Sequence, residues 1–186
     1  ASDAPQVVSV TADGEARGVG LGRATIRAVF EALTATRPLR VVPDFEGVWT
    51  GEYRIAKCTR TSGRGPDFCR AILGIQLPFK LALIQTGDRP IGTLDLYDNL
   101  GGPLETGSVE GSIDDDGALL LAGDTRSLDE VHPRETKITD WRSELAADSD
   151  SMIGRFVQTT AFINAWGPQQ SREECEIVRL ERAPRS

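Results

Sequence analysis

The sequence has few of the residues that most often bind nucleic acid or carry out acid-base chemistry. One His and three Lys are present, so 18 of the 21 basic residues are Arg, and the formal net charge is -7 at pH 7. Nucleic-acid phosphates and anionic membrane surfaces attract proteins that carry clustered Lys and Arg. A net negative charge disfavours such binding. We therefore expect no nucleic-acid partner. The excess of Arg reads as genome composition, and it leaves open protein contacts made by Arg-carboxylate pairs.

Long apolar runs are also missing. No segment approaches the roughly 20 apolar residues that cross a bilayer, and no charged-then-apolar leader stands at the N-terminus. The sequence predicts no transmembrane segment. Any association with a membrane would then run through a partner or through a missing N-terminal anchor.

Motifs for catalysis are absent as well. His132 lies in a polar stretch, 130–134, with no nucleophile beside it, so we interpret it as a surface residue rather than a general base. Gly18, Gly20 and Gly22 lack the strand-to-helix context of a dinucleotide-binding fingerprint. No serine-hydrolase or phosphate-loop motif occurs. We expect no enzyme, no catalytic residue and no cofactor.

Two acidic clusters could supply oxygen ligands to a metal ion. The Asp-Asp-Asp-Gly run at 114–117 lacks the alternating ligands and the distal Glu of a calcium loop. We interpret it as a solvated hairpin turn, and the Asp-Ser-Asp-Ser run at 148–151 as a loop. The sequence therefore predicts no metal site.

Three cysteines are present. Cys58 and Cys69 flank a polar loop with two Gly and one Pro, where a disulfide can form without distorting a strand. We predict this disulfide, and with it an oxidising compartment, the periplasm or the outside of the cell. Two thiolates and one distant His do not make a zinc site. Cys175 is left over, and a buried, inert thiol is favoured over a bond to another chain.

The clearest pattern is the alternation in residues 47–55. Trp49, Gly51, Tyr53 and Ile55 fall on one face of a strand, and polar residues fall on the other. After residue 44 the same period recurs, interrupted by Gly- and Asp-rich turns. Eight strands are predicted, over about 47–57, 76–86, 91–98, 106–113, 118–124, 136–145, 152–164 and 174–182. Such strands, joined by hairpins and without helices between them, predict a small eight-stranded antiparallel up-and-down barrel.

The inward face of this barrel is predicted from the same alternation. It reads as almost wholly apolar, which favours an interior filled by side chains over one that holds a ligand. An apolar cavity of more than a few hundred Å³ would favour a ligand carrier instead. Beyond the first strand, the predicted inward residues are Leu77, Phe79, Leu81, Leu83, Leu94, Leu96, Val109, Ile113, Leu119, Leu121, Val178 and Leu180.

Residues 1–43 are predicted to form a separate unit of short strands, followed by the barrel domain, 44–186. Pro43 marks the boundary, because proline cannot donate to a sheet and the pattern restarts after it. An amphipathic helix over 26–36 is the competing interpretation. Thr and Val within this segment favour a strand over 24–30, with a further one over 39–42.

Residues 2–28 resemble the C-terminal half of a bacterial immunoglobulin-like domain of the group 2 type. The resemblance rests on a Ser-Asp pair, a Val-rich strand, a Gly turn and the motif Gly20-x-Gly22-x-Ala24-Thr25-Ile26-x-Ala28. It implies a partial Ig-like β-sandwich that acts as a structural or adhesive spacer. Half of such a domain leaves an open strand edge that needs cover. We expect Arg17, Arg23 and Arg27 to contact acidic groups of a partner there.

The barrel resembles the lipocalin-like (calycin) family. The resemblance rests on Gly47-x-Trp49 in the first strand and on Arg182 at the end of the last strand. In that family the Trp closes the base of the barrel and the Arg stacks across it through a cation-π contact. Arg179 is the alternative stacking residue.

Two functions are compatible with these patterns. The favoured one is a non-catalytic extracytoplasmic scaffold or accessory subunit, which docks by protein-protein contacts on a larger envelope or membrane complex, such as a respiratory, photosynthetic or surface assembly. The alternative is a lipocalin-like carrier of a small hydrophobic ligand.

Overall fold

The structure is a computed structural model that describes residues 1–129, 131, 133–147 and 149–184. Nearly all its regular elements are strands, which confirms the all-β fold class. The chain divides into two compact units, 1–44 with 115–117 and 45–114 with 118–186. The first division falls after Asp44, one residue beyond the boundary expected at Pro43.

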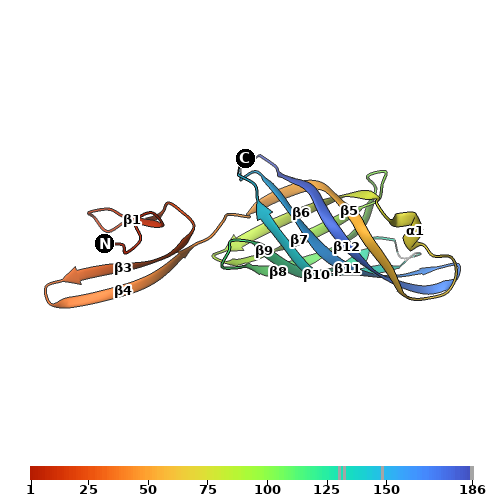
Figure 1. Cartoon of the computed structure of the whole chain (residues 1–186), viewed down its shortest axis with the longest axis horizontal. Coiled ribbons are helices and arrows are strands. Elements are labelled where there is room, and N and C mark those ends of the chain that lie inside the picture. The colour runs from red at the N-terminus through yellow and green to blue at the C-terminus, as the bar shows by residue number, and fades with distance from the viewer. Residues whose placement is uncertain (130, 132, 148, 185–186) are drawn as a thin grey trace. The chain divides into compact units, whose positions relative to one another are not determined.

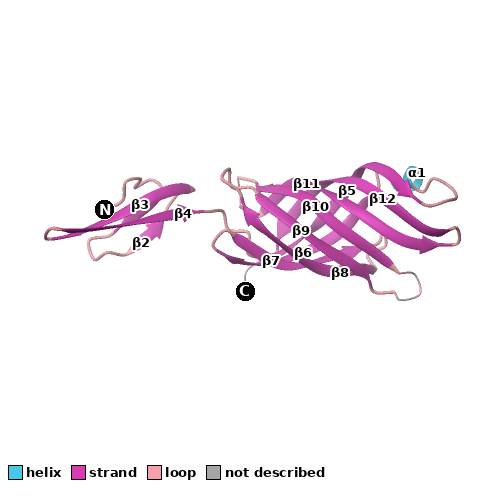
Figure 2. Ribbon diagram, turned by 90° about the horizontal axis from the view of Figure 1, so that it is seen from below, coloured by secondary structure: helices cyan, strands magenta, loops and turns pink. Residues whose placement is uncertain are grey.

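The larger unit is a closed antiparallel barrel of eight strands (Figure 1; Figure 2). Each strand pairs with the next along the chain, and the last returns to pair with the first, so the barrel has no open edge. This confirms the up-and-down topology. The strands are β5 (Gly47–Ser62), β6 (Gln76–Thr86), β7 (Arg89–Tyr97), β8 (Pro103–Ile113), β9 (Leu119–Ser127), β10 (Arg134–Leu145), β11 (Ser151–Asn164) and β12 (Gly167–Arg182).

Alternation positions the inward side chains as the sequence predicts for most strands. Trp49, Tyr53 and Ile55 of β5 are buried, and the residues between them are exposed or half-buried. The hairpin turns fix the register between neighbours. At the β6–β7 turn, for example, Thr86 pairs with Arg89 across a two-residue loop, and Gly87 takes the positive φ of 62° that such a loop requires at its first position.

A β-bulge in β12 corrects one predicted inward residue. Ile177 pairs with Tyr53 and Arg179 with Glu52, so Val178 is an extra residue on β12. Such a bulge shifts the alternation by one place. As a result Ile177 and Leu180 point inward, whereas Val178 is 46% exposed.

The barrel interior has two halves of different chemistry. The apolar half lies where β5 begins and β12 ends, and contains Trp49, Trp141, Phe79 and Phe156 among its buried side chains. The ring centroids of Trp141 and Phe156 lie 4.8 Å apart in a stacked arrangement. The polar half lies where β5 ends and β12 begins. Its buried residues are Glu105, Thr125, Thr136, Gln158, Thr160, Ser171 and Glu173.

The polar half shows that the expectation of an almost wholly apolar interior is wrong. Several strands are longer than predicted: β8 begins at Pro103 and β12 at Gly167. Glu105, Ser171 and Glu173 occupy inward positions in these additional stretches of β8 and β12. In the sequence these stretches look like loops because they are polar. The two-residue alternation of inward and outward positions nevertheless continues through them.

The smaller unit contains β1 (Val8–Val10), β2 (Ala16–Gly18), β3 (Gly22–Phe30) and β4 (Leu33–Val41). β1 pairs with β2 and β3 pairs with β4, which gives two separate two-stranded sheets. A strand, not a helix, therefore occupies 26–30. The strand expected at 39–42 is the end of the longer β4. A small core formed by Val7, Val8 and Ala24 holds the unit together.

Candidate functional site in the polar half of the barrel

A cavity of about 450 Å³ opens from the polar half of the barrel. Its walls are mainly apolar, and the polar side chains inside the barrel belong to β10, β11 and β12. The loop between β7 and β8 contributes Asp98 and Asn99 to the rim. The other lining residues are Ile55, Phe68, Ile72, Ile75, Leu77, Leu104, Arg134, Gln158, Thr160, Phe162, Ser171 and Glu173.

The predicted disulfide is present and fixes one side of the cavity. Cys58 on β5 is bonded to Cys69, with their Cα atoms 5.3 Å apart. Cys69 begins the short helix α1 (Cys69–Ile72), which carries Ile72 to the cavity wall. Phe68 precedes the helix and meets Phe162 of β11 edge-to-face, with centroids 4.9 Å apart. The disulfide therefore holds an apolar wall in place beside the polar side chains.

Glu105 is the first of two buried carboxylates in the polar half. Its oxygens accept hydrogen bonds from the Thr125 hydroxyl at 2.7 Å and the Thr136 hydroxyl at 3.1 Å. The Arg134 guanidinium forms an ion pair with it. A buried charge is tolerated when it is paired and hydrogen-bonded in this way. The buried charge of Glu105 is thus balanced by Arg134 and by hydrogen bonds within the chain.

Glu173 is the second buried carboxylate, and its partners differ. It accepts hydrogen bonds from the Thr160 hydroxyl at 2.9 Å and from the Ser171 hydroxyl. The Thr136 hydroxyl lies 3.3 Å from that of Thr160, so a chain of hydroxyls connects the two carboxylates. Within the part of the chain that the structure describes, Glu173 has no cationic side chain in ion-pair contact.

Gln158 is fully buried at the base of the cavity. Neither its amide nitrogen nor its amide oxygen has a partner with normal hydrogen-bond distance and angle among the described residues. Burial raises the pKa of the neighbouring Tyr53 phenol, and a weak hydrogen bond between this phenol and Gln158 partly offsets the rise. Burial also raises the pKa of the Cys175 thiol, and the Glu173 carboxylate adds to this effect. The phenol and the thiol therefore stay neutral near pH 7.

The opposite end of the barrel is closed by the two residues on which the lipocalin resemblance rests. The Arg182 guanidinium carbon lies 4.5 Å from the centre of the Trp49 ring. The Trp49 indole nitrogen donates a hydrogen bond of 2.9 Å to the Phe45 carbonyl. Arg179, the alternative stacking residue, instead forms an ion pair of 2.8 Å with Glu181 at the surface.

Of the remaining predicted site residues that the structure describes, none is among the residues that line the cavity. Arg17, Arg23 and Arg27 are exposed on the smaller unit. Arg23 forms an ion pair of 2.6 Å with Asp115 of the same chain, and no partner chain is present to test the expected contacts. Cys175 is buried and outside any disulfide, as favoured. His132 lies outside the described residues, as does residue 148 of the second acidic cluster.

The acidic turn at 114–117 connects β8 to β9, as interpreted from the sequence. The Asp114 carboxylate accepts a hydrogen bond of 2.9 Å from the Ala118 amide, which stabilises this turn. Among the residues that the structure describes, no group of three or more His, Cys, Asp or Glu side chains is arranged to hold a metal ion. No helix within these residues is long and apolar enough to cross a membrane.

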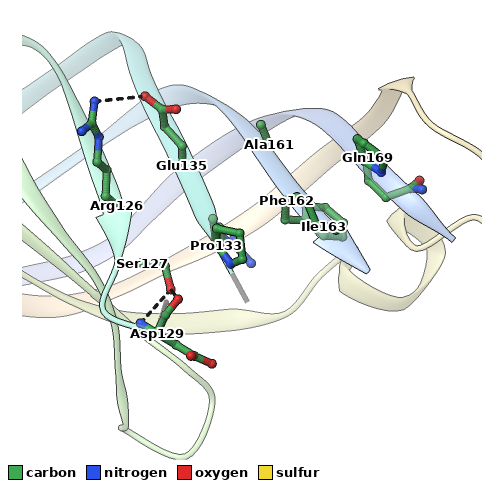
Figure 3. Close-up of a pocket in the computed structure, with 11 residues that line it drawn as sticks. Arg126, Ser127, Asp129, Pro133, Glu135, Ala161, Phe162, Ile163 and Gln169 are labelled. Atoms are coloured by element: carbon green, nitrogen blue, oxygen red, sulfur yellow. Dashed lines mark hydrogen bonds and ion pairs between the residues drawn. The ribbon is translucent and has the colours of Figure 1, made fainter. Parts of the chain in front are cut away.

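A second hollow, of about 710 Å³, lies at the same end of the barrel and shares Arg134 and Phe162 with the cavity (Figure 3). Arg126 of β9 and Glu135 of β10 form an ion pair of 3.7 Å beside it, and Ser127 bonds to the backbone of Asp129. These polar groups satisfy one another. The hollow is wide and open to solvent, so the cavity inside the barrel is the better candidate for a ligand site.

Sequence reasoning missed Glu105, Gln158, Thr160 and Glu173. A usable signal existed, because Ser171, Glu173, Cys175 and Ile177 alternate along one strand as regularly as the apolar residues do. Comparison with known proteins gives no family assignment: no protein-family model and no curated protein sequence matches the chain.

Proposed function

We propose that the barrel binds one small, mainly apolar molecule inside its polar half. The observation that carries this proposal is the cavity of about 450 Å³, which falls within the usual size range of small-molecule pockets. Its apolar walls supply binding energy and its few polar groups supply orientation. This volume exceeds the few hundred Å³ above which we expected a ligand carrier rather than a filled barrel.

Two further observations support this function. The lipocalin-like pair, Trp49 and Arg182, is in contact at the opposite end of the barrel, so the polar half is the natural entrance. The Cys58–Cys69 disulfide fits an exported protein in the periplasm or outside the cell, where a carrier of apolar molecules would act.

Calorimetric titration with n-decanol tests the proposal. The wild-type protein should bind one decanol molecule. Ile75→Trp, which fills the cavity, should weaken binding at least tenfold. Ile84→Trp is the matched control because Ile84 is 66% exposed on the outer wall, and it should bind as the wild type does. Absence of binding to the wild type, or undiminished binding to a folded Ile75→Trp variant, would contradict the proposal.

Docking on a larger envelope assembly is the second candidate function, and the smaller unit supports it. Directly paired residues of β3 and β4 share a face. At the base of the hairpin this face is covered by the core around Val7 and Val8. Towards the tip the same face is bare, and Phe30 and Leu33 are each 73% exposed. An apolar segment of a partner protein would continue the cover that the core begins.

The partner we propose is a protein with acidic residues flanking that apolar segment. Residues 1–43 contain five Arg and four acidic residues, a net charge of +1, and the rest of the chain carries -8. Arg23 is ion-paired with Asp115 of its own chain, so Arg27 is the side chain of β3 that we expect to fix register with a carboxylate of the partner. Residues 1–3 cover part of the outer edge of β3, so a bound strand would pair with the edge of β4.

Hydrogen exchange tests the docking role. The amides of 22–41 should exchange rapidly in the isolated protein and slowly in the native assembly. Phe30→Asp combined with Leu33→Asp should abolish recovery in that assembly. Thr34→Asp, on the other face of the hairpin, should preserve it. Strong and equal protection in both states would contradict the need for a partner.

A further inference from the structure

The polar side chains of the cavity indicate the chemical class of the ligand. Resting on the proposed ligand-binding function, we propose that the bound molecule has an apolar body and a cationic, hydrogen-bond-donating head group, such as a primary amine, which binds Glu173 and Gln158. The argument depends on a buried carboxylate without a cationic partner among the described residues, a buried amide without a hydrogen bond of normal geometry, and their positions side by side.

Glu173 and Gln158 are neighbours across two paired strands. Gln158 of β11 lies directly opposite Glu173 of β12 in the register, and both line the cavity. Directly opposed residues place their side chains on the same face, about 5 Å apart at Cβ. Glu173 is 1% exposed and Gln158 is fully buried, so both side chains point into the barrel. One head group can therefore reach both.

Glu173 is prepared to receive a cation. Two hydroxyls, from Thr160 and Ser171, donate to it and hold its orientation. Neither hydroxyl carries charge, and the described residues place no cation in ion-pair contact with it. A buried carboxylate is costly without a cationic partner. An ammonium group would supply the charge and up to three donors.

Gln158 supplies the acceptor and donor that complete such a site. Buried side-chain amides nearly always have hydrogen-bond partners. Among the described residues, neither polar atom of Gln158 makes a hydrogen bond of normal geometry, and its contact with the Tyr53 phenol is a weak one. An ammonium N–H would donate to its amide oxygen while another donates to Glu173. An alkyl chain would then extend towards the apolar walls formed by residues such as Leu77 and Phe162.

The charge balance disfavours an anionic head group. Among the described residues, Arg134 is the one cationic side chain in the cavity lining, and its guanidinium is already paired with Glu105. Glu173 and the rim residue Asp98 bring the lining to a net negative charge. A carboxylate ligand would approach Glu173 without compensation, and like charges repel strongly in a poorly solvated site.

Three ligands of equal chain length test the inference: n-decylamine, n-decanol and n-decanoate, each titrated below its micelle concentration at pH 7. The wild-type protein should bind decylamine about tenfold or more tightly than decanol, because a charge-assisted hydrogen bond adds at least that factor. Decanoate should bind most weakly.

Glu173→Gln keeps the shape of the side chain and removes its charge. In this variant decylamine should bind only as tightly as decanol does, and the affinity for decanol should stay unchanged. Glu174→Gln is the matched control because Glu174 points outward to Lys57 and Arg172, and it should retain the preference for the amine.

The outcomes separate the inference from the function on which it rests. If none of the three ligands binds, the ligand cavity itself is refuted. If decanol binds and decylamine binds no more tightly, or if decanoate binds best, the cavity stands and the cationic head group is refuted. A preference for the amine that survives Glu173→Gln also refutes the assignment. The wild-type comparison gives its answer even if the variant does not fold.

Discussion

The two halves of the barrel interior are built on the same eight strands with the same alternation, yet they differ in chemistry. Around Trp49 and Trp141 the inward side chains are mainly aromatic or aliphatic, and the buried Ser143 hydroxyl accepts a hydrogen bond from the Trp141 indole. Around Gln158 and Glu173 they are polar, and a cavity lies beside them. Burial of apolar surface stabilises a fold, whereas buried polar groups without partners destabilise it. The apolar half therefore accounts for stability, and ligand binding is the role that we propose for the polar half.

Removal of an aromatic side chain from the apolar half should have the largest effect. Trp49→Ala deletes a fully buried ring that packs against Arg182 and donates to Phe45. We expect a loss of about 3 to 5 kcal/mol in the free energy of unfolding. Urea denaturation followed by fluorescence of the remaining Trp residues measures it. A loss below about 1 kcal/mol would contradict the role given to this half.

The Cys58–Cys69 disulfide should come next in size. Replacing both residues by Ser should cost about 3 kcal/mol and should loosen α1, which forms a wall of the cavity. Intact mass after denaturation without reduction should show one alkylated thiol, that of Cys175. In the native protein this thiol should stay unmodified, because it is buried and its pKa is raised. Alkylation of all three thiols without reduction would disprove the disulfide.

The Trp49–Arg182 contact should contribute less than the ring itself. Arg182→Leu should lower the free energy of unfolding by about 1 to 2 kcal/mol, since it removes a partly desolvated cation-π contact. Arg179→Leu is the matched control, because Arg179 lies at the surface and pairs only with its near neighbour Glu181; a change below about 0.5 kcal/mol is expected. Equal effects of the two substitutions would show that the closing pair is misassigned.

A substitution in the polar half should have the smallest effect on stability. Gln158→Leu replaces a buried amide that makes no hydrogen bond of normal geometry by an apolar side chain of similar size, and it also removes the polar neighbour of the Tyr53 phenol. Because these two effects oppose each other, we expect the free energy of unfolding to change by less than about 1 kcal/mol, while affinity for n-decylamine falls. Thermal unfolding and titration together measure both effects. A loss of stability comparable to that of a core truncation would erase the contrast between the two halves.

The sequence predicts the barrel well because its apolar half follows simple rules. Each predicted strand overlaps an observed one, and the hairpin turns fall where Gly and Asp interrupt the pattern. The disulfide followed from the loop that its cysteines flank. The bulge that turns Val178 outward was not predictable, since an extra residue in one strand leaves no mark in local composition.

The candidate site was missed for a related reason. Strand ends were judged by where apolar residues stop, and the polar inward residues begin at that point. Glu105 and Glu173 therefore fell in predicted loops, although they lie within β8 and β12. Gln158 lay inside a predicted strand, but its missing partners depend on three-dimensional packing. In such barrels the pattern to look for is a polar stretch that continues the two-residue alternation of an adjoining apolar stretch.

Xenon binding compares the two halves most directly. Crystals of the protein exposed to xenon gas should show xenon beside the apolar cavity walls, near Ile55 and Leu77, because xenon enters cavities lined by apolar side chains. They should show none among Phe79, Trp141 and Phe156, where the rings are in contact. Xenon in the apolar half, or an interior without xenon at both ends, would contradict the account of a filled half and a binding half.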